Sequence, residues 1–276
     1  MKTIARWALA GVVALAAQAN QSAIAQELSA AQIIEKNAAA RGGAEAWRKV
    51  QTMAWTGHVE SANVPGRNMR FVLAQKRPHS TRFEISGENQ RSLRVYDGSN
   101  GWKVRPSAGG TPEAKPYTSE ELSFARGAQV IDGPLMDYAA KGAAITLGGV
   151  DTVGGRKAYR LDVRQISGLG ARIWVDAESY LEARYDRESR ALDRPSTVSV
   201  TYHDYRPFEG LQMPTVIETG SSTDSAKSKL VIEKVALNPQ MKDQMFEKPR
   251  IAVARHGGVI VDTRSAQAPA TLRRSP

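Results

Sequence analysis

The sequence predicts a mainly β protein of the α+β class, in which about ten antiparallel strands follow an N-terminal helix. Apolar and polar residues alternate along much of the chain after Met53, which is typical of strands with one dry face and one wet face. Asp97-Gly98 and Asn100-Gly101 are turn signals of the kind that join neighbouring antiparallel strands. The spacing of these strands and turns is that of a sandwich or a barrel.

The first expected element is a helix over residues 29–50. Ser29 begins it, and Gln32 follows three residues later, which is the spacing of a capping box. The apolar residues of this segment fall near one face. Gly42-Gly43 is expected to break or kink the helix, because glycine is unfavourable in a helix interior.

Strand patterns of period two occur in both halves of the chain, separated by a segment of different character. Their central residues include Phe71, Phe83, Val95, Leu161, Ile173 and Val200, with further strands near Val216 and over residues 229–237.

The segment between the two halves is expected to be a loop followed by helices. Residues 106–116 are rich in glycine, proline and small residues. Thr118 and Glu121 form a second capping-box pattern, so residues 120–141 are expected to be helical or of mixed structure. Gly133-Pro134 interrupts them, which predicts two short helices rather than one long one.

Residues 1–25 have the three-part pattern of a secretory signal peptide. Lys2 and Arg6 form a positive start, an apolar run follows, and Ala23-Ile24-Ala25 fits the motif that signal peptidase cleaves. We expect cleavage after this motif, with a position after Ala19 as the competing choice. The apolar run is shorter than the about 20 residues that cross a bilayer, and a retained N-terminal anchor is the alternative.

The predicted organisation is a cleaved leader (residues 1–25), one domain (residues 26–250) and a basic C-terminal extension (residues 251–276). Within the extension, residues 251–253 and 259–261 are expected to add a strand, and the last ten residues are expected to be disordered.

Composition excludes several classes of protein. The chain has no cysteine, so it has no disulfide framework, no thiolate metal site and no cysteine for lipid attachment. About 250 residues are enough for a hydrophobic core to hold the domain together, and no later apolar stretch reaches membrane-spanning length, so a soluble mature protein is expected.

Removal of the leader lowers the formal charge from +10 to +8. The basic residues are scattered without a nucleic-acid-binding motif, so nucleic acid is not an expected partner.

The motifs that would indicate catalysis are absent. There is no G-x-S-x-G and no H-E-x-x-H, and the four histidines lie far apart without metal-ligand spacing. Gly154-Gly155 before Arg156-Lys157 lacks the Gly-Lys-Ser/Thr of a phosphate loop, and a hairpin turn explains it better. Glu120 and Glu121 are adjacent, so on a helix they point about 100° apart and favour a role as first-turn charges. We therefore expect no catalytic residue, no metal site and no cofactor.

Five segments occur together in an order that resembles one group of exported proteins. They are Ile34-Glu35-Lys36-Asn37-Ala38-Ala39-Ala40-Arg41-Gly42-Gly43 followed by Trp47, Val95-Tyr96-Asp97-Gly98 with Gly101-Trp102, Gly155-Arg156-Lys157-Ala158-Tyr159-Arg160-Leu161, Arg172-Ile173-Trp174-Val175-Asp176 with Tyr180-Leu181, and residues 238–246 with Pro249. Over about residues 33–249 the chain is similar to the LolA-like family, the outer-membrane lipoprotein-sorting proteins.

This resemblance implies a half-open antiparallel β-barrel whose concave face is covered by the N-terminal helix and short lid helices. It also implies a periplasmic binding or carrier protein that shields a hydrophobic ligand, lipoprotein acyl chains or another lipid, during transfer between membranes. A membrane-protein donor and acceptor are the expected partners, and a monomer is the expected state. The insertion at residues 106–116 and the basic extension depart from the best-known carrier, so no individual binding residue is carried over.

Large apolar residues are the candidate lining of such a cavity, since an apolar cavity stays dry and binds apolar guests. About 12 buried methylenes would contribute about 10 kcal/mol before the costs of binding. Core packing is the alternative role for each aromatic residue. Trp102→Ala is expected to weaken uptake of a fluorescent fatty acid while the fold survives. The candidate ligand-binding residues are Trp55, Phe71, Phe83, Tyr96, Trp102 and Trp174 on strands, and Leu122, Phe124 and Val130 on the lid.

Two other functions remain open from the sequence. The same pocket would also suit a sensor or interaction module that signals to a membrane partner, and a stable complex with an inner-membrane protein would favour it. An exported hydrolase is the third hypothesis, which turnover abolished by a single substitution would favour.

Overall fold

The computed structural model describes residues 28–61, 69–87, 90–106, 112–127, 131–164, 170–189, 196–253 and 259–261. The expected signal peptide and the last ten residues lie outside this part of the chain, and so does Val130. Within the described residues, no helix combines the length and the apolar character needed to cross a membrane.

Thirteen strands in the described part form one antiparallel sheet, compared with the about ten that the sequence predicts. The sheet consists of two meanders, and they join where the first strand pairs with the last of the thirteen. In spatial order the strands are β6 (Lys115–Pro116), β5 (Gly101–Val104), β4 (Gln90–Tyr96), β3 (Ser80–Gly87), β2 (Met69–Lys76), β1 (Thr52–Ser61), β13 (Asp224–Leu237), β12 (Leu211–Ser221), β11 (Ser196–Phe208), β10 (Glu182–Ser189), β9 (Gly170–Asp176), β8 (Arg156–Arg164) and β7 (Ala144–Val153).

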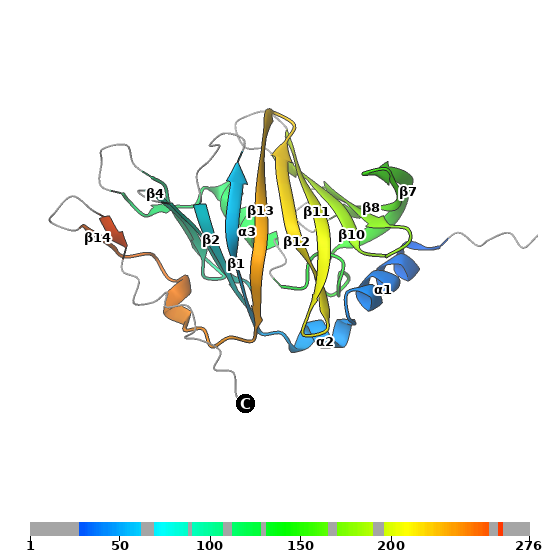
Figure 1. Cartoon of the computed structure of the whole chain (residues 1–276), viewed down its shortest axis with the longest axis horizontal. Helices are drawn as coiled ribbons and strands as arrows, with labels where there is room; N and C mark the ends of the chain where they lie inside the picture. The colour runs from blue at the N-terminus through cyan, green and yellow to red at the C-terminus, as the bar shows by residue number, and fades with distance from the viewer. Residues whose placement is uncertain are drawn as a thin grey trace, which may run out of the picture.

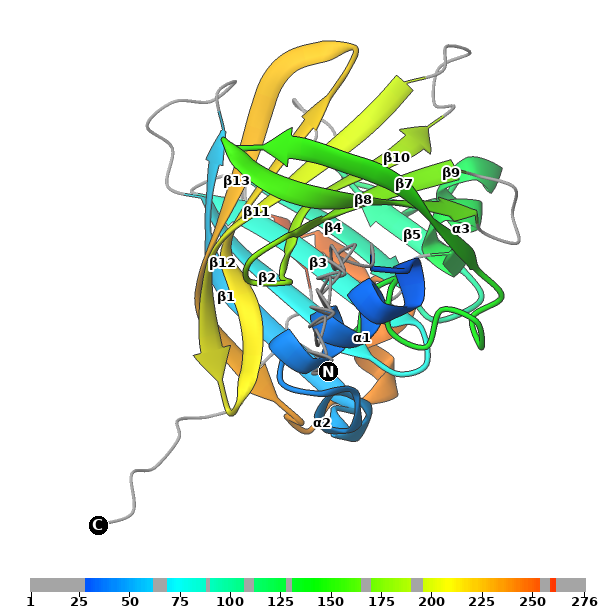
Figure 2. The same cartoon turned by 90° about the vertical axis from the view of Figure 1, so that its right-hand side faces the viewer.

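The sheet curls into a trough, so that the strands β7 to β10 lie in front of β2 to β5 when the molecule is viewed from its side (Figure 2). Among the described strands, the edges β6 and β7 do not pair with each other, so the barrel is half open. A β-bulge at Gly57 bends β1 against β13. Only glycine fits there, because a Cβ would lie 1.9 Å from the carbonyl oxygen of Val231. The half-open antiparallel β-barrel is therefore confirmed.

Two helices precede the sheet and confirm the helix predicted over residues 29–50, together with its break. In α1 (Ala30–Ala40), the Gln32 N–H donates to the Ser29 hydroxyl at 3.3 Å, and the Ser29 N–H donates to the Gln32 side chain at 2.9 Å. α2 (Ala44–Lys49) follows after the glycine pair. Gly42 has φ of 104°, and a Cβ at this position would lie 2.4 Å from the carbonyl oxygen of Gly210.

The crossover between the two meanders contains one α-helix and a run of turns. α3 (Ser119–Gly127) has the predicted capping box, since the Glu121 N–H donates to the Thr118 hydroxyl at 3.2 Å. The second short helix, predicted to end at residue 141, is wrong. Residues 131–142, which we call the crossover turns, are successive turns and bends instead. Positive φ angles at Gly133 and Asp137 and the missing N–H of Pro134 prevent a regular helix.

The inner face of the sheet packs against α1, α2 and the crossover turns. Ile33 of α1 lies in one core with Leu161 of β8. Trp47 of α2 lies in a second core with Met53 and Met213, at the end of the trough where α2 lies (Figure 2). These contacts fill two parts of the trough and leave space between them.

The outer face carries a separate core over β2 to β5. A 3₁₀ turn, η2 (Asp243–Phe246), lies beside the strands β2 and β4 (Figure 1). Its residue Phe246 packs in this core with Leu93 and Val95. Farther along, β14 (Ile251–Val253) and β15 (Val259–Val261) pair with each other and not with the main sheet. The division at residue 250 into a domain and a basic extension stays a prediction.

Candidate ligand-binding site

A cavity of about 430 Å³ lies on the inner face of the sheet, between β1, β2 and the strands β9 to β12. Its volume falls within the roughly 300–1,000 Å³ of small-molecule sites. The crossover turns and α3 contribute residues to it from the open side of the trough. Its apolar and aromatic lining consists of Trp47, Met53, Trp55, Phe124, Ile131, Pro134, Ala171, Tyr185, Val198, Val200, Tyr202, Tyr205, Met213, Pro214 and Ile217.

β11 and β12 supply the long wall of the cavity, because alternate residues of an antiparallel strand face the same side. Val198, Val200 and Tyr202 face inward from β11, and Ile217 faces inward from β12. The seven steps from Val198 to Tyr205 cover about 23 Å of strand. We call the end at Val198 and Phe124 the mouth, and the end at Trp47 and Met213 the closed end.

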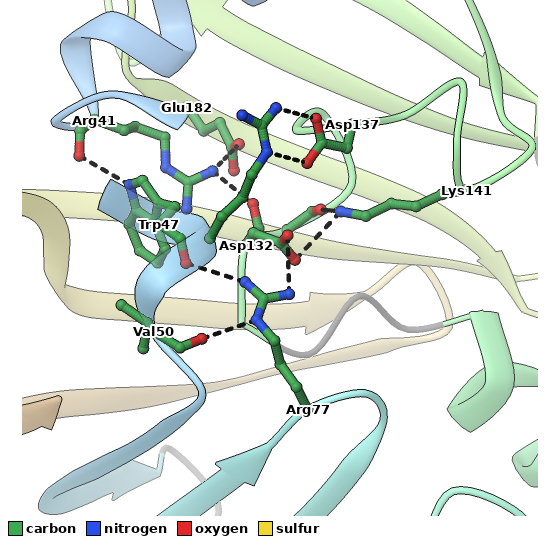
Figure 3. A network of polar contacts seen from close by, with 10 residues as sticks. Arg41, Trp47, Val50, Arg77, Asp132, Asp137, Lys141 and Glu182 are labelled. Atoms are coloured by element: carbon green, nitrogen blue, oxygen red, sulfur yellow. Dashed lines mark hydrogen bonds and ion pairs between the residues drawn. The ribbon is translucent and has the colours of Figure 1, made fainter. Parts of the chain in front are cut away.

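The closed end is held by Asp132 of the crossover turns (Figure 3). Its carboxylate is only 5% exposed and forms ion pairs with Arg77 at 3.1 Å and Lys141 at 3.2 Å. Its carbonyl oxygen accepts a hydrogen bond from Arg41 at 2.9 Å. Arg77 also donates to two carbonyl groups at the end of α2, at 2.8 and 3.1 Å. Charge-assisted bonds thus join the α1–α2 segment, the end of β2 and the crossover turns.

Arg41 and Glu182 place compensated charges beside the closed end. Both are buried, and the Arg41 guanidinium lies 3.5 Å from the Glu182 carboxylate. The same guanidinium lies over the Trp47 ring, 4.3 Å from its centroid, and the Trp47 indole N–H donates to the Arg41 carbonyl at 2.9 Å. A buried guanidinium that is ion-paired and stacked in this way already has its charge compensated, so it is not a strong binding group for a ligand.

Two tyrosines add neutral polar groups to the wall. Burial raises the pKa of Tyr202 and of Tyr205, and the nearby Glu182 carboxylate raises both further. The Tyr205 hydroxyl donates to the Glu182 carbonyl oxygen at 2.9 Å. Both phenols are therefore protonated at neutral pH and serve as hydrogen-bonding groups rather than as bases.

α3 is fixed over the mouth by Glu121. This carboxylate forms ion pairs with Lys103 at 2.7 Å and with Arg94 at 3.1 Å. Burial by itself raises the pKa of Glu121, but the Lys103 ammonium, the Thr118 backbone N–H and the Arg94 guanidinium together lower it from 4.5 to about 2. The helix then holds Phe124, which is 41% exposed, at the edge of the cavity.

The structure brings some of the predicted site residues together at this cavity. Trp55 and Phe124 line it. Phe71 and Phe83 lie on the same inner face with their ring centroids 6.1 Å apart, but they pack in the core beside the cavity. Tyr96 also faces inward by its register, is buried, and donates its hydroxyl to the carbonyl oxygen of Gly98 at 2.8 Å.

Trp102 and Trp174 lie on the outer face of the sheet. Trp102 is paired with Val95, which belongs to the outer core. Trp174 donates its indole N–H to Asp151 at 2.8 Å, and Arg184 stacks on its ring. Leu122 is half-buried on α3 and does not line the cavity.

Sequence reasoning missed several residues of the wall. Met53, Met213 and Ile217 are apolar but not aromatic, and size guided the choice of candidates. Val198 and Val200 belong to a strand pattern visible in the sequence. Their alternation with Ser199 and Thr201 is the signal that could have identified this face of β11 as the inner one.

The described residues contain no group of three or more His, Asp or Glu side chains placed to hold a metal ion. The acidic groups at the cavity are single carboxylates, of which Glu182 is paired with Arg41. The site therefore offers shape, apolar surface and a few polar groups, as binding pockets for small molecules do.

No protein-family model and no curated protein matches the sequence. Solved structures do match. A LolA superfamily protein from Nitrosomonas europaea superposes with a TM-score of 0.51 at 16% identity, over 80% of this chain and 98% of that chain. A DUF1329 family protein from Desulfovibrio piger gives 0.50 at 13% identity, over 78% and 95% of the two chains. A domain described as an outer membrane lipoprotein-sorting protein from Vibrio parahaemolyticus gives 0.50 at 12%, over 78% and 95%. At these identities the likeness concerns the fold alone, and the chain has the LolA-like fold that its sequence resembles.

Proposed function

We propose that this protein is a periplasmic binding or carrier protein that shields a hydrophobic ligand, lipoprotein acyl chains or another lipid, during transfer between membranes. The observation that carries the proposal is the cavity of about 430 Å³ on the inner face of the sheet. Covering apolar surface contributes about 25 cal/mol per Å², so a long apolar guest has a driving force to enter. The lipoprotein-sorting domain of similar fold supports the same role.

Binding rather than catalysis is favoured by the state of the polar groups. The Glu182 carboxylate is paired with Arg41, and the phenols of Tyr202 and Tyr205 are neutral. Neutral phenols of this kind orient a ligand through hydrogen bonds and do not act as bases near neutral pH.

The shape of the cavity suggests how a ligand is exchanged. Asp132 and its two cations hold the crossover turns at the closed end, whereas α3 borders the mouth with the partly exposed Phe124. We infer that the ligand enters and leaves at the mouth. The sequence has no nucleotide motif, so release depends on a membrane-protein acceptor, or on a membrane, that binds the ligand better.

A substitution that fills the cavity tests this function. Val200 lies on the cavity wall, and Val200→Trp would place an indole in the space that the ligand needs. We expect the wild-type protein to take up a fluorescent fatty acid, and the variant to lose uptake by at least about tenfold, which corresponds to about 1.4 kcal/mol.

Val72→Trp is the matched control, because Val72 is 42% exposed and alternates with Leu73, which faces inward. This variant should bind the probe as the wild type does. Wild-type uptake in Val200→Trp would show that the cavity is not the binding site, and no uptake in the wild-type protein would overturn the proposed function.

A further inference from the structure

Arg187 places a positive charge in the wall of the cavity near its mouth. Its neighbours across the sheet are Ala171 of β9 and Val198 of β11, and all three residues line the cavity. Its guanidinium lies over the ring of Phe124, 4.0 Å from the centroid. The charge therefore lies between the sheet and α3, where a ligand would pass.

This guanidinium has no carboxylate partner among the described residues. Glu120 attracts it from α3 and Arg94 repels it from β4. Glu188, the next residue on β10, also borders the mouth, but its carboxylate lies against Gly170 of β9. The planar edge of the Arg187 side chain, with its N–H donors, thus remains available.

Three arginines close to the cavity differ from Arg187, because each of them is paired with a carboxylate. Burial lowers the pKa of Arg187, but arginine stays protonated at neutral pH, so its charge persists in a half-buried position. Half-buried charges are normally compensated. The compensated pairs are Arg41–Glu182, Arg77–Asp132 and Arg94–Glu121.

We infer that the cavity takes an anionic amphiphile, with a carboxylate or phosphate headgroup bound by Arg187 at the mouth and an acyl chain running toward the closed end. This inference rests on the proposed function and specifies its ligand. The apolar residues along β11 and β12 provide the path for the chain. Arginine suits either headgroup, because its planar fork donates two parallel hydrogen bonds to a carboxylate or a phosphate.

Direct binding of three single-chain lipids tests the inference. The full-length mature protein is titrated calorimetrically with palmitate, with palmitoyl lysophosphatidate and with neutral monopalmitoylglycerol, each below its critical micelle concentration. We expect at least one anionic lipid to bind about tenfold more tightly than the neutral one, the effect of a charge-assisted hydrogen bond. The anion with the stronger preference identifies a carboxylate or a phosphate as the headgroup.

Arg187→Gln should abolish the preference for anionic lipid, so that neither anionic lipid binds more tightly than the neutral one. Arg187→Met serves the same purpose if the glutamine variant unfolds, because it keeps an apolar stem against Phe124. Arg187→Lys should retain part of the preference, since it keeps the charge and loses the fork. The matched control is Arg172→Gln, which removes the same charge from the exposed outer face of the neighbouring strand β9.

The outcomes separate the inference from the proposed function. Equal binding of all three lipids by the wild type, or an anionic preference that survives in Arg187→Gln and Arg187→Met, overturns the role of Arg187 and leaves the carrier proposal standing. If Arg172→Gln loses as much of the preference for anionic lipid as Arg187→Gln does, the preference reflects the net charge of the protein. That result also overturns the role of Arg187. Absence of binding by every lipid overturns both.

Discussion

The inner and outer faces of one sheet use similar residues for different purposes. Trp55 faces inward from β1 and lines a cavity, whereas Trp102 lies on the outer face beside the apolar residues that η2 covers. Both occur in strands of the same meander, and both are half-buried. The curl of the sheet, and not the presence of an aromatic residue, therefore determines which apolar face encloses a cavity.

The two faces also differ in how they are covered. Phe246, 2% exposed, holds η2 on the outer face by apolar packing. The crossover turns are held over the inner face by the buried Asp132 and its cations. Leu135 and Met136 of the same turns also pack in the inner cores, so the inner cover combines apolar contacts with buried ion pairs, and the cavity lies beside it.

The largest expected effect is on the outer cover. Phe246→Ala removes a buried aromatic ring and should lower the free energy of unfolding by about 4 kcal/mol, measured by urea denaturation. Uptake of the fluorescent fatty acid by the folded variant should be unchanged, because the cavity lies on the other face. Lost uptake in a fully folded sample would break the separation between the faces.

The inner cover gives the next largest effect. Asp132→Asn leaves the Arg77 and Lys141 charges without their carboxylate, and should lower the free energy of unfolding by about 3 kcal/mol.

Asp243→Asn is the matched control, because it removes the same charge from an ion pair in the outer cover. Asp243 is 85% exposed, so its pair with Lys76 should contribute about 0.5 kcal/mol. Equal losses of unfolding free energy in Asp132→Asn and Asp243→Asn would show that burial does not make the ion pairs of Asp132 more stabilising.

Substitution of the two tryptophans tests the difference between the faces by ligand binding. Trp55→Ala should weaken uptake of the fluorescent fatty acid about tenfold, or about 1.4 kcal/mol, since it removes part of the cavity wall. Trp102→Ala should leave uptake within about twofold of the wild type. This replaces the effect that the sequence predicts for Trp102, and a larger loss in Trp102→Ala than in Trp55→Ala would reverse the assignment of the faces.

The smallest expected effect concerns pH and α3. The pKa of Glu121 is lowered to about 2 in the folded protein, so its contribution to stability is present above pH 4.5 and is lost as the pH falls toward 2. Arg94 is 40% exposed, and solvent screening limits the contribution of the Glu121 ion pairs to about 1 kcal/mol of unfolding free energy.

Denaturation of wild type and Glu121→Gln at several pH values measures this contribution. The difference in their free energies of unfolding should shrink between about pH 5 and pH 2, where the wild-type carboxylate takes up a proton. A difference that stays constant over this interval would mean that the ion pairs of Glu121 do not stabilise α3.

Local signals in the sequence account for much of the fold. The capping boxes at Ser29 and Thr118, the glycine break at Gly42 and the period-two strands all depend on neighbours within a few residues. The same reasoning failed for residues 131–142, because Arg41 after α1 and Arg77 after β2 hold these turns, and both partners lie far away in sequence.

The amino-acid pattern alone is enough to predict alternating strands in an antiparallel sheet, a helix before the sheet and a helix in its crossover, because these elements follow from short-range sterics and periodicity. The identity of the alternate residues that face the cavity follows from the three-dimensional structure alone. The same holds for Arg187, which has no carboxylate partner within the described ranges, whereas Arg94 has one. The reason is that register and curvature arise from contacts between distant strands, and a shift of one residue exchanges the inner and outer faces.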